Sequence, residues 1–240
     1  MKNKTKLPVL RGLARNTILE HPYGPIIVVF FCFLITGMLN CTAALFSLGE
    51  GLGFFLIYQV VSFLMQIMIA VFEIGKKKYF VDLSEKGDAP LLTLFVAFRG
   101  NVPTILGAAC LIEMIRYAFT LPSVILSYYN PISLQNPKES AVIIGLIFLG
   151  YLLGYLATIP FFPLLYLIGD FRSMPAGKAI RMSFWLMKGN FWRYIGFCIS
   201  LIPMILLGIL SFGIGFLWIS PFLQSSFAEF YLDLLKQKKK

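Results

Sequence analysis

Long apolar stretches alternate with short polar segments along the chain, and this alternation predicts helices that cross a membrane. A helix needs about 20 apolar residues to span the hydrocarbon core of a bilayer. Four such stretches lie near residues 24 to 48, 52 to 74, 102 to 128 and 140 to 168. A further stretch, from about 194 to 235, is too long for one crossing, and the small residues at 211 to 215 predict a tight turn within it. The pattern therefore predicts six transmembrane helices in a single membrane domain of residues 1 to 240, the last two near 194 to 211 and 214 to 235.

Basic residues surround these stretches in a way that predicts the topology. Of the 21 Lys and Arg residues, 19 lie in four clusters, at residues 1 to 23, 75 to 101, 169 to 193 and in the carboxyl tail. With six spans, all four clusters fall on one face of the membrane, and the opposite face holds only Lys138. Cytoplasmic segments of membrane proteins carry such an excess of Lys and Arg. We therefore expect both termini to be cytoplasmic.

Composition excludes a soluble globular protein, because 58% of the residues are apolar and only 13% are charged. The net charge of +10 would indicate nucleic acid as a partner in a soluble chain. Here the basic residues adjoin predicted spans, so the expected partner is the lipid bilayer with its anionic inner leaflet, and no nucleic acid.

Two connecting segments on the predicted cytoplasmic side repeat a pattern. Arg99-Gly100-Asn101 precedes the third span, and Lys188-Gly189-Asn190 precedes the fifth. A short segment with helical character comes before each triplet, at about 90 to 99 and 176 to 188, and a weaker version at about 8 to 20 precedes the first span. We expect interfacial amphipathic helices at these places, the two triplets ending theirs in a left-handed turn. The predicted fold is thus all-α: three transmembrane hairpins, each preceded by an interfacial helix.

Four sequence segments are distinctive in combination: AIRMSFWLMKGNFWRYIGF, LSFGIGFLWISPF and AEFY between Ala179 and Leu232, and YFVDLSEKGDAPLLTLFVAFRGN from Tyr79 to Asn101. They resemble a bacterial family of integral membrane proteins of unknown function, domain of unknown function 975. The resemblance implies a six-span protein of the bacterial cytoplasmic membrane, without established catalytic residues. One departure is Phe222, because the family often has tyrosine after the proline of its last span.

The sequence shows no pattern of residues typical of metal or nucleophilic catalysis. His21 is the only histidine, and no glycine-rich phosphate loop is present. The cysteines lie far apart in predicted spans and are expected to be unpaired packing residues: Cys32, Cys41, Cys110 and Cys198. We predict no metal, no cofactor and no enzymatic activity.

Charged residues inside a span are the best candidates for function, because burying charge in hydrocarbon is costly. Glu113 and Arg116 lie near the centre of the third span, and their i, i+3 spacing places them on one helical face. They are either a site for gating or coupling, or a structural clamp whose hydrogen bonds are completed by Gln59, Gln66 or a backbone carbonyl. The sequence favours the clamp.

The remaining candidates have structural interpretations. Glu73 and Glu229 lie near the inner ends of the second and sixth spans, where pairing with Lys76 to Lys78 and with Lys236 explains them. Gly150 and Gly154 form a G-x-x-x-G face for helix packing, within the bundle or across a homodimer. Prolines at three positions should kink the fourth and sixth spans: Pro160, Pro163 and Pro221.

Three function classes remain. The sequence favours a non-enzymatic scaffold or accessory subunit that binds another membrane protein. The alternative is a transporter or channel component that uses Glu113 and Arg116. A membrane-embedded enzyme acting on lipid ranks last, because no nucleophile pattern supports it.

Overall fold

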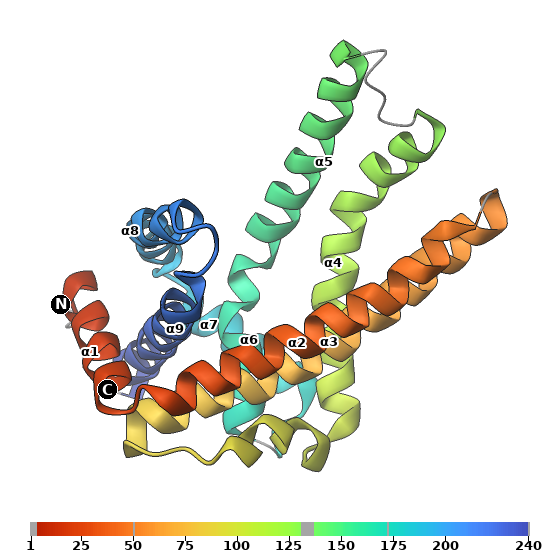
Figure 1. Cartoon of the computed structure of the whole chain (residues 1–240). Helices are drawn as coiled ribbons and strands as arrows, with labels where there is room; N and C mark the ends of the chain where they lie inside the picture. Colours follow the sequence, from red (N-terminus) through yellow and green to blue (C-terminus); the bar gives the residue numbers. More distant parts are fainter. Residues whose placement is uncertain (1–3, 50, 131–136, 172, 240) are drawn as a thin grey trace.

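The computed structural model describes residues 4–49, 51–130, 137–171 and 173–239 (Figure 1). Within these ranges every regular element is a helix, which confirms the predicted all-α class. In chain order the elements are α1 (Leu7–Glu20), α2 (Tyr23–Leu45), η1 (Phe46–Leu48), α3 (Leu52–Lys86), η2 (Leu91–Arg99), α4 (Val102–Tyr129), α5 (Pro137–Thr158), η3 (Ile159–Phe161), α6 (Phe162–Asp170), α7 (Ala176–Met187), α8 (Phe191–Leu210) and α9 (Phe216–Lys239). The η segments are 3₁₀-helices.

Five helical segments are long and apolar enough to cross a membrane, as expected of a multi-pass membrane protein: Tyr23–Leu45, Leu52–Lys86, Val102–Tyr129, Lys138–Asp170 and Phe191–Leu210. Only 11% to 28% of the residues in their most apolar windows are buried inside the protein. Such extensive exposed apolar surface marks a membrane interaction. Helix α9 is not among the five, because its second half carries Glu229, Asp233 and several lysines. The sixth span therefore stays a prediction.

Helix α3 is longer than a membrane crossing requires. Its 35 residues extend about 52 Å at 1.5 Å per residue, whereas the hydrocarbon core is about 30 Å thick. Burial divides the helix accordingly: no residue before Ala70 is buried, and most residues from Ala70 to Leu83 are. The second half of α3 thus belongs to a packed part of the protein beyond the exposed apolar segment.

The short helices that precede α2, α4 and α8 each pack against a longer or neighbouring helix, and for α1 that helix comes from the opposite end of the chain. η2 lies on α3, α7 on α6, and α1 on α9. A Cβ at Gly75 of α3 would lie only 1.9 Å from the Leu94 carbonyl oxygen, so α3 and η2 touch along their backbones. The contact of α1 with α9 brings the two ends of the chain together (Figure 1).

Large aromatic side chains fill the core where these helices meet. Tyr79 and Phe80 of α3, Tyr166 of α6, and Phe230 and Tyr231 of α9 are all at most 2% exposed. The rings of Tyr166 and Tyr231 stack with centroids 4.9 Å apart. Buried aromatic pairs contribute both apolar area and directional ring contacts. We call this region, made of α1, η2, α6, α7, the first half of α8 and the second halves of α3 and α9, the packed end.

Ion pairs connect the helices of the packed end. Lys78 Nζ lies 2.8 Å from an Asp170 carboxylate oxygen and 3.0 Å from Asp82, and Lys86 pairs with the same Asp82 oxygen at 2.7 Å. Arg193, at the start of α8, pairs with Asp233 of α9 at 2.6 Å. Thr5 and Gln237 also donate hydrogen bonds to the Asp233 carboxylate, at 2.5 and 2.6 Å. Each of these buried carboxylates is matched by a cation or by several donors.

The two basic-Gly-Asn triplets adopt different turns. Gly189 has φ +82°, in the left-handed region as predicted, and the Asn190 side chain donates to the Leu186 carbonyl. Gly100 has φ −93° and extended ψ, so the predicted left-handed turn is wrong there. The reason is that Asn101 instead caps α4, its side-chain oxygen accepting from the Thr104 backbone N–H.

The predicted kinks lie at the expected prolines of the fourth apolar stretch. Pro160 falls in η3, which interrupts the helix between α5 and α6, and Pro163 lies in the first turn of α6. The Pro160 carbonyl accepts a hydrogen bond from the Ser183 hydroxyl of α7 at 2.9 Å, so a carbonyl at the break finds a partner. Pro221 lies inside α9, which continues through it.

Candidate functional site

Glu113 and Arg116 form a direct ion pair on α4. Arg116 Nη1 donates to Glu113 Oε1 at 2.7 Å. The Glu113 side chain is 6% exposed, whereas 46% of the Arg116 side-chain surface is accessible. The carboxylate is therefore buried beneath a guanidinium that retains several N–H donors facing open space.

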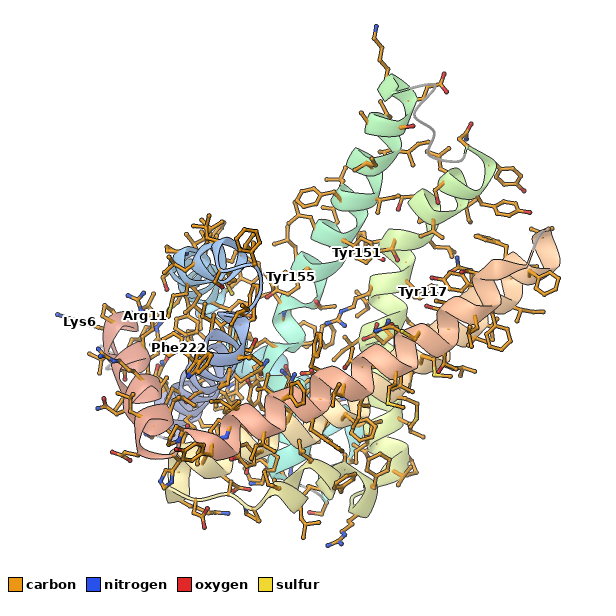
Figure 2. The ribbon with its side chains drawn as sticks, viewed as in Figure 1. Lys6, Arg11, Tyr117, Tyr151, Tyr155 and Phe222 are labelled. Atoms are coloured by element: carbon orange, nitrogen blue, oxygen red, sulfur yellow. The ribbon has the colours of Figure 1, made fainter. Side chains whose placement is uncertain are left out.

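A cavity of about 470 Å³ surrounds this pair, between α3, α4 and α5. Polar and aromatic side chains line it: Tyr58, Gln59, Ser62 and Gln66 of α3, Glu113, Arg116, Tyr117 and Thr120 of α4, and Tyr151 and Tyr155 of α5. In Figure 2, Tyr117 and the two α5 tyrosines lie along the facing helices α4 and α5. We call this space the first cavity.

The two glycines of α5 position that helix against the Arg116 turn of α4. A Cβ at Gly150 would lie 2.8 Å from the Phe119 carbonyl oxygen, and one at Gly154 would lie 3.5 Å from the Arg116 Cα. Larger residues would push α5 away from α4. The G-x-x-x-G face thus packs within the chain, and it places Tyr151 and Tyr155, one residue beyond each glycine, at the cavity.

Gln59 and Gln66 line the cavity but do not complete the hydrogen bonds of the ion pair in the described structure. The Tyr117 hydroxyl lies 3.0 Å from both carbonyl oxygens of Gln59, backbone and side chain. The Gln59 Nε2 is buried and has no hydrogen-bond partner among the described residues. Gln66 donates to Asn40 of α2 at 3.3 Å. The Gln59 amide and the accessible Arg116 guanidinium, which line the same cavity, therefore have hydrogen-bond donors that no described residue accepts.

A second, smaller cavity of about 180 Å³ adjoins the first, because Arg116 and Tyr155 line both. Its other polar lining residues are Lys77 of α3, Thr158 of α5, Tyr194 of α8 and Gln224 of α9. The Tyr155 and Tyr194 hydroxyls lie 3.4 Å apart. Apolar walls come from Ile112, Ile159, Phe161, Phe162, Leu165 and Phe227. This second cavity lies where α3, α4, α5, α8 and α9 approach one another.

The two inner-end glutamates have different surroundings. Glu73 pairs with Lys76 and lies 3.9 Å from Lys77 Nζ, so the two lysines share one carboxylate. Glu229 is buried on α9, at 7% exposure, within electrostatic range of Lys236. Phe222, next to Pro221, is partly buried and packs against the core of the packed end.

The tyrosines of the first cavity and the cationic lining of the second were missed from the sequence. Tyr151 and Tyr155 carry a weak signal, namely two tyrosines at i, i+4 spacing beside two glycines in one apolar stretch. Lys77 was read only as a pairing partner for Glu73. No group of three His, Cys, Asp or Glu side chains suited to a metal ion occurs among the described residues.

Comparisons with known proteins identify the chain at the family level. No curated protein and no solved structure matches it. The family model DUF975, described as a protein of unknown function, matches residues 10–238. This match covers nearly the whole chain, including both cavities and the packed end. The protein therefore belongs to the DUF975 family.

Proposed function

We propose that this protein is a transporter or channel component that binds its ligand in the first cavity, at Glu113 and Arg116. The observation that carries the proposal is the cavity itself. It combines a half-exposed guanidinium over a buried carboxylate with an unpartnered Gln59 amide. Unpaired polar groups cost free energy in hydrocarbon, and a ligand that accepts their hydrogen bonds offsets that cost. A purely structural clamp needs no such cavity.

The same proposal includes six spans in a bacterial cytoplasmic membrane, with both termini cytoplasmic. The 19 clustered basic residues support this orientation. The packing of α1 on α9 and the hydrogen bond from Thr5 to Asp233 also support it, because they hold the two ends of the chain on one side. An even number of crossings meets this condition, with the first half of α9 returning the chain. The segments α1, η2 and α7 are then interfacial.

Cysteine accessibility tests the proposed function without knowledge of the ligand. In a variant lacking the four native cysteines, Ser62→Cys places a thiol in the first cavity. Leu64→Cys is the matched control, because Leu64 lies on the same helix with 54% exposure and does not line the cavity. We expect a charged, membrane-impermeant thiosulfonate to modify Ser62→Cys from each side of sealed vesicles in turn, and not Leu64→Cys. Protection of Ser62→Cys on both sides would contradict a transport site.

An accessory role is the second candidate, and the exposed basic side chains of α7 favour it. Lys178 and Arg181 of α7 and the adjacent Lys188 are exposed at the packed end. A partner with an acidic surface would bind there. The test is co-purification from native membranes: Arg181→Glu with Lys188→Glu should release such a partner, while Lys138→Glu should not.

A further inference from the structure

The charges around the two cavities do not balance. Among the described residues, Glu73 is the only carboxylate paired with Lys76 and Lys77, and Glu113 is the only one paired with Arg116. Within the same part of the chain, Glu113 is the only Asp or Glu that lines either cavity. Arg116 also lies within electrostatic range of Glu73 and Lys77, so the five groups form one cluster. Three cations face two carboxylates, and one positive charge is left over.

The neighbouring network of the packed end is balanced instead. Lys78 and Lys86 face Asp82 and Asp170, two cations against two carboxylates. Lys77 and Lys78 are adjacent in sequence, and their side chains have similar exposure, 16% and 13%. Only Lys77 lines a cavity. Lys77 Nζ lies 4.8 Å from the centroid of the Tyr166 ring, a cation–π contact that offsets part of the cost of burying its charge. A bound anion would offset the rest, because a buried cation without a full counter-charge is costly in a medium of low dielectric constant.

We propose that the two adjoining cavities together bind one phosphate-type oxyanion headgroup of an amphipathic molecule, held between Arg116 and Lys77. This inference rests on the proposed function, since it names the class of molecule that enters the same site. Arg116 offers a planar fork of donors and Lys77 a compact charge, the combination that recognises phosphate oxygens. The Thr158 hydroxyl already donates to the Tyr155 backbone carbonyl. The hydroxyls of Tyr155 and Tyr194, which share one hydrogen bond, and the amide of Gln224 supply further donors around the second cavity.

The apolar walls indicate that the anion carries a hydrocarbon part. Ile112, Leu165 and Phe227 line the second cavity beside the cations. The helices around it also present exposed apolar surface to the bilayer, as Leu152 and Leu156 of α5 show at 43% and 40% exposure. A phospholipid can place its headgroup between the cations while its chains remain along α5. Free phosphate shares the headgroup chemistry but gains nothing from these walls.

Native mass spectrometry of the full-length protein in a non-ionic detergent tests the inference. The probes are dioleoyl phosphatidylglycerol, dioleoyl phosphatidylcholine and inorganic phosphate. We expect one molecule of phosphatidylglycerol to be retained in preference to phosphatidylcholine. Lys77→Gln and Arg116→Gln should each lower the retained fraction about tenfold, the effect of losing about 1.4 kcal/mol. Arg15→Gln, which removes an exposed cation of α1, should leave retention unchanged.

Further arms separate the possible outcomes. Lys77→Arg keeps the charge and should restore retention, which separates loss of the site from loss of folding. Displacement of phosphatidylglycerol by millimolar inorganic phosphate would support the oxyanion site and identify free phosphate as its occupant; no displacement would identify the lipid. Equal retention by Lys77→Gln and the unmodified protein, or of the two lipids, would overturn the inference. If the inference is overturned but Ser62→Cys is labelled, the proposed function remains supported. If Ser62→Cys is also protected, both the inference and the proposed function are wrong.

Discussion

The packed end and the cavity region both bury charged side chains in an apolar protein, but they differ in whether each cation has a carboxylate to neutralise it. At the packed end the Asp233 carboxylate pairs with Arg193 and accepts hydrogen bonds from Thr5 and Gln237. The network around Lys78 has equal numbers of cations and carboxylates. Around the cavities, Arg116 and Lys77 share too few carboxylates among the described residues. Complete networks stabilise a fold, and incomplete ones leave groups for a ligand.

Packing separates the two regions in the same way. The packed end closes around fully buried aromatic rings, and its helices approach until backbone touches backbone at Gly75. Around the cavities α5 also approaches α4 closely at Gly150, yet side chains beyond that contact enclose about 470 Å³ of open space. Close helix contact in this protein therefore produces a solid core at one end and a cavity wall at the other.

The largest expected effect is on the packed end, from Asp233→Leu. The change leaves Arg193 buried without its carboxylate, and breaking a buried ion pair from one side costs about 3–5 kcal/mol. We expect the unfolding temperature in detergent to fall sharply, with much less protein in the membrane. Asp88→Leu, at an exposed position, is the control and should behave like the unmodified protein. Normal stability of Asp233→Leu would show that the network does not hold α1, α8 and α9 together.

A smaller effect is expected from Gly75→Ala. The added Cβ would meet the Leu94 carbonyl, so η2 must move away from α3, and overpacking of this kind costs about 1–3 kcal/mol. Thermal unfolding measures the loss. Gly107→Ala is the matched control, because a Cβ at that helical glycine meets nothing within 4 Å, and alanine there should be neutral or slightly stabilising. Equal stabilities of the two variants would argue against the close contact.

The double variant Glu113→Gln with Arg116→Gln should change stability by less than about 1 kcal/mol, because replacing both partners does not leave the buried Glu113 carboxylate without its cation. A change this small would favour a ligand-binding site over the structural clamp that the sequence favours. Chemical denaturation in mixed micelles measures the change. A loss of about 3 kcal/mol or more would restore the clamp interpretation.

The one expected gain in stability is about 1 kcal/mol in Gln59→Met, since the change removes a buried amide NH2 group that has no partner among the described residues. The Tyr117 hydroxyl keeps the Gln59 backbone carbonyl as an acceptor, because that group is unchanged. A modest rise in the unfolding temperature is the expected measurement. A fall would mean that the amide already contributes to stability without a ligand.

Local features of this protein could be predicted from its sequence. Glu113 and Arg116 were found because charge is rare in an apolar stretch and their i, i+3 contact lies within one helix turn. The helical class and most long apolar segments follow from stretch length alone. The interruption at Pro160 was also predicted, because proline lacks the N–H that a continuous helix needs.

Features that depend on contacts between distant segments could not be predicted. Lys77 and Lys78 are neighbours in one basic run, and only the approach of Asp170 from α6 distinguishes them. Tyr194 is buried beside Tyr155, a contact that depends on the approach of α8 to α5. The packing of α1 on α9 joins opposite ends of the chain, and no local pattern encodes it.

The most direct test of the account compares these two adjacent lysines. Lys77→Gln and Lys78→Gln remove the same charge from one helix, and each protein is measured for unfolding temperature and for retention of dioleoyl phosphatidylglycerol. The account predicts that Lys77→Gln loses lipid and stays stable, whereas Lys78→Gln loses stability, because Asp82 and Asp170 lose their shared cation, and retains lipid in the fraction that remains folded. The same loss of lipid and of stability in both proteins would contradict the claim that unbalanced charge marks the binding site.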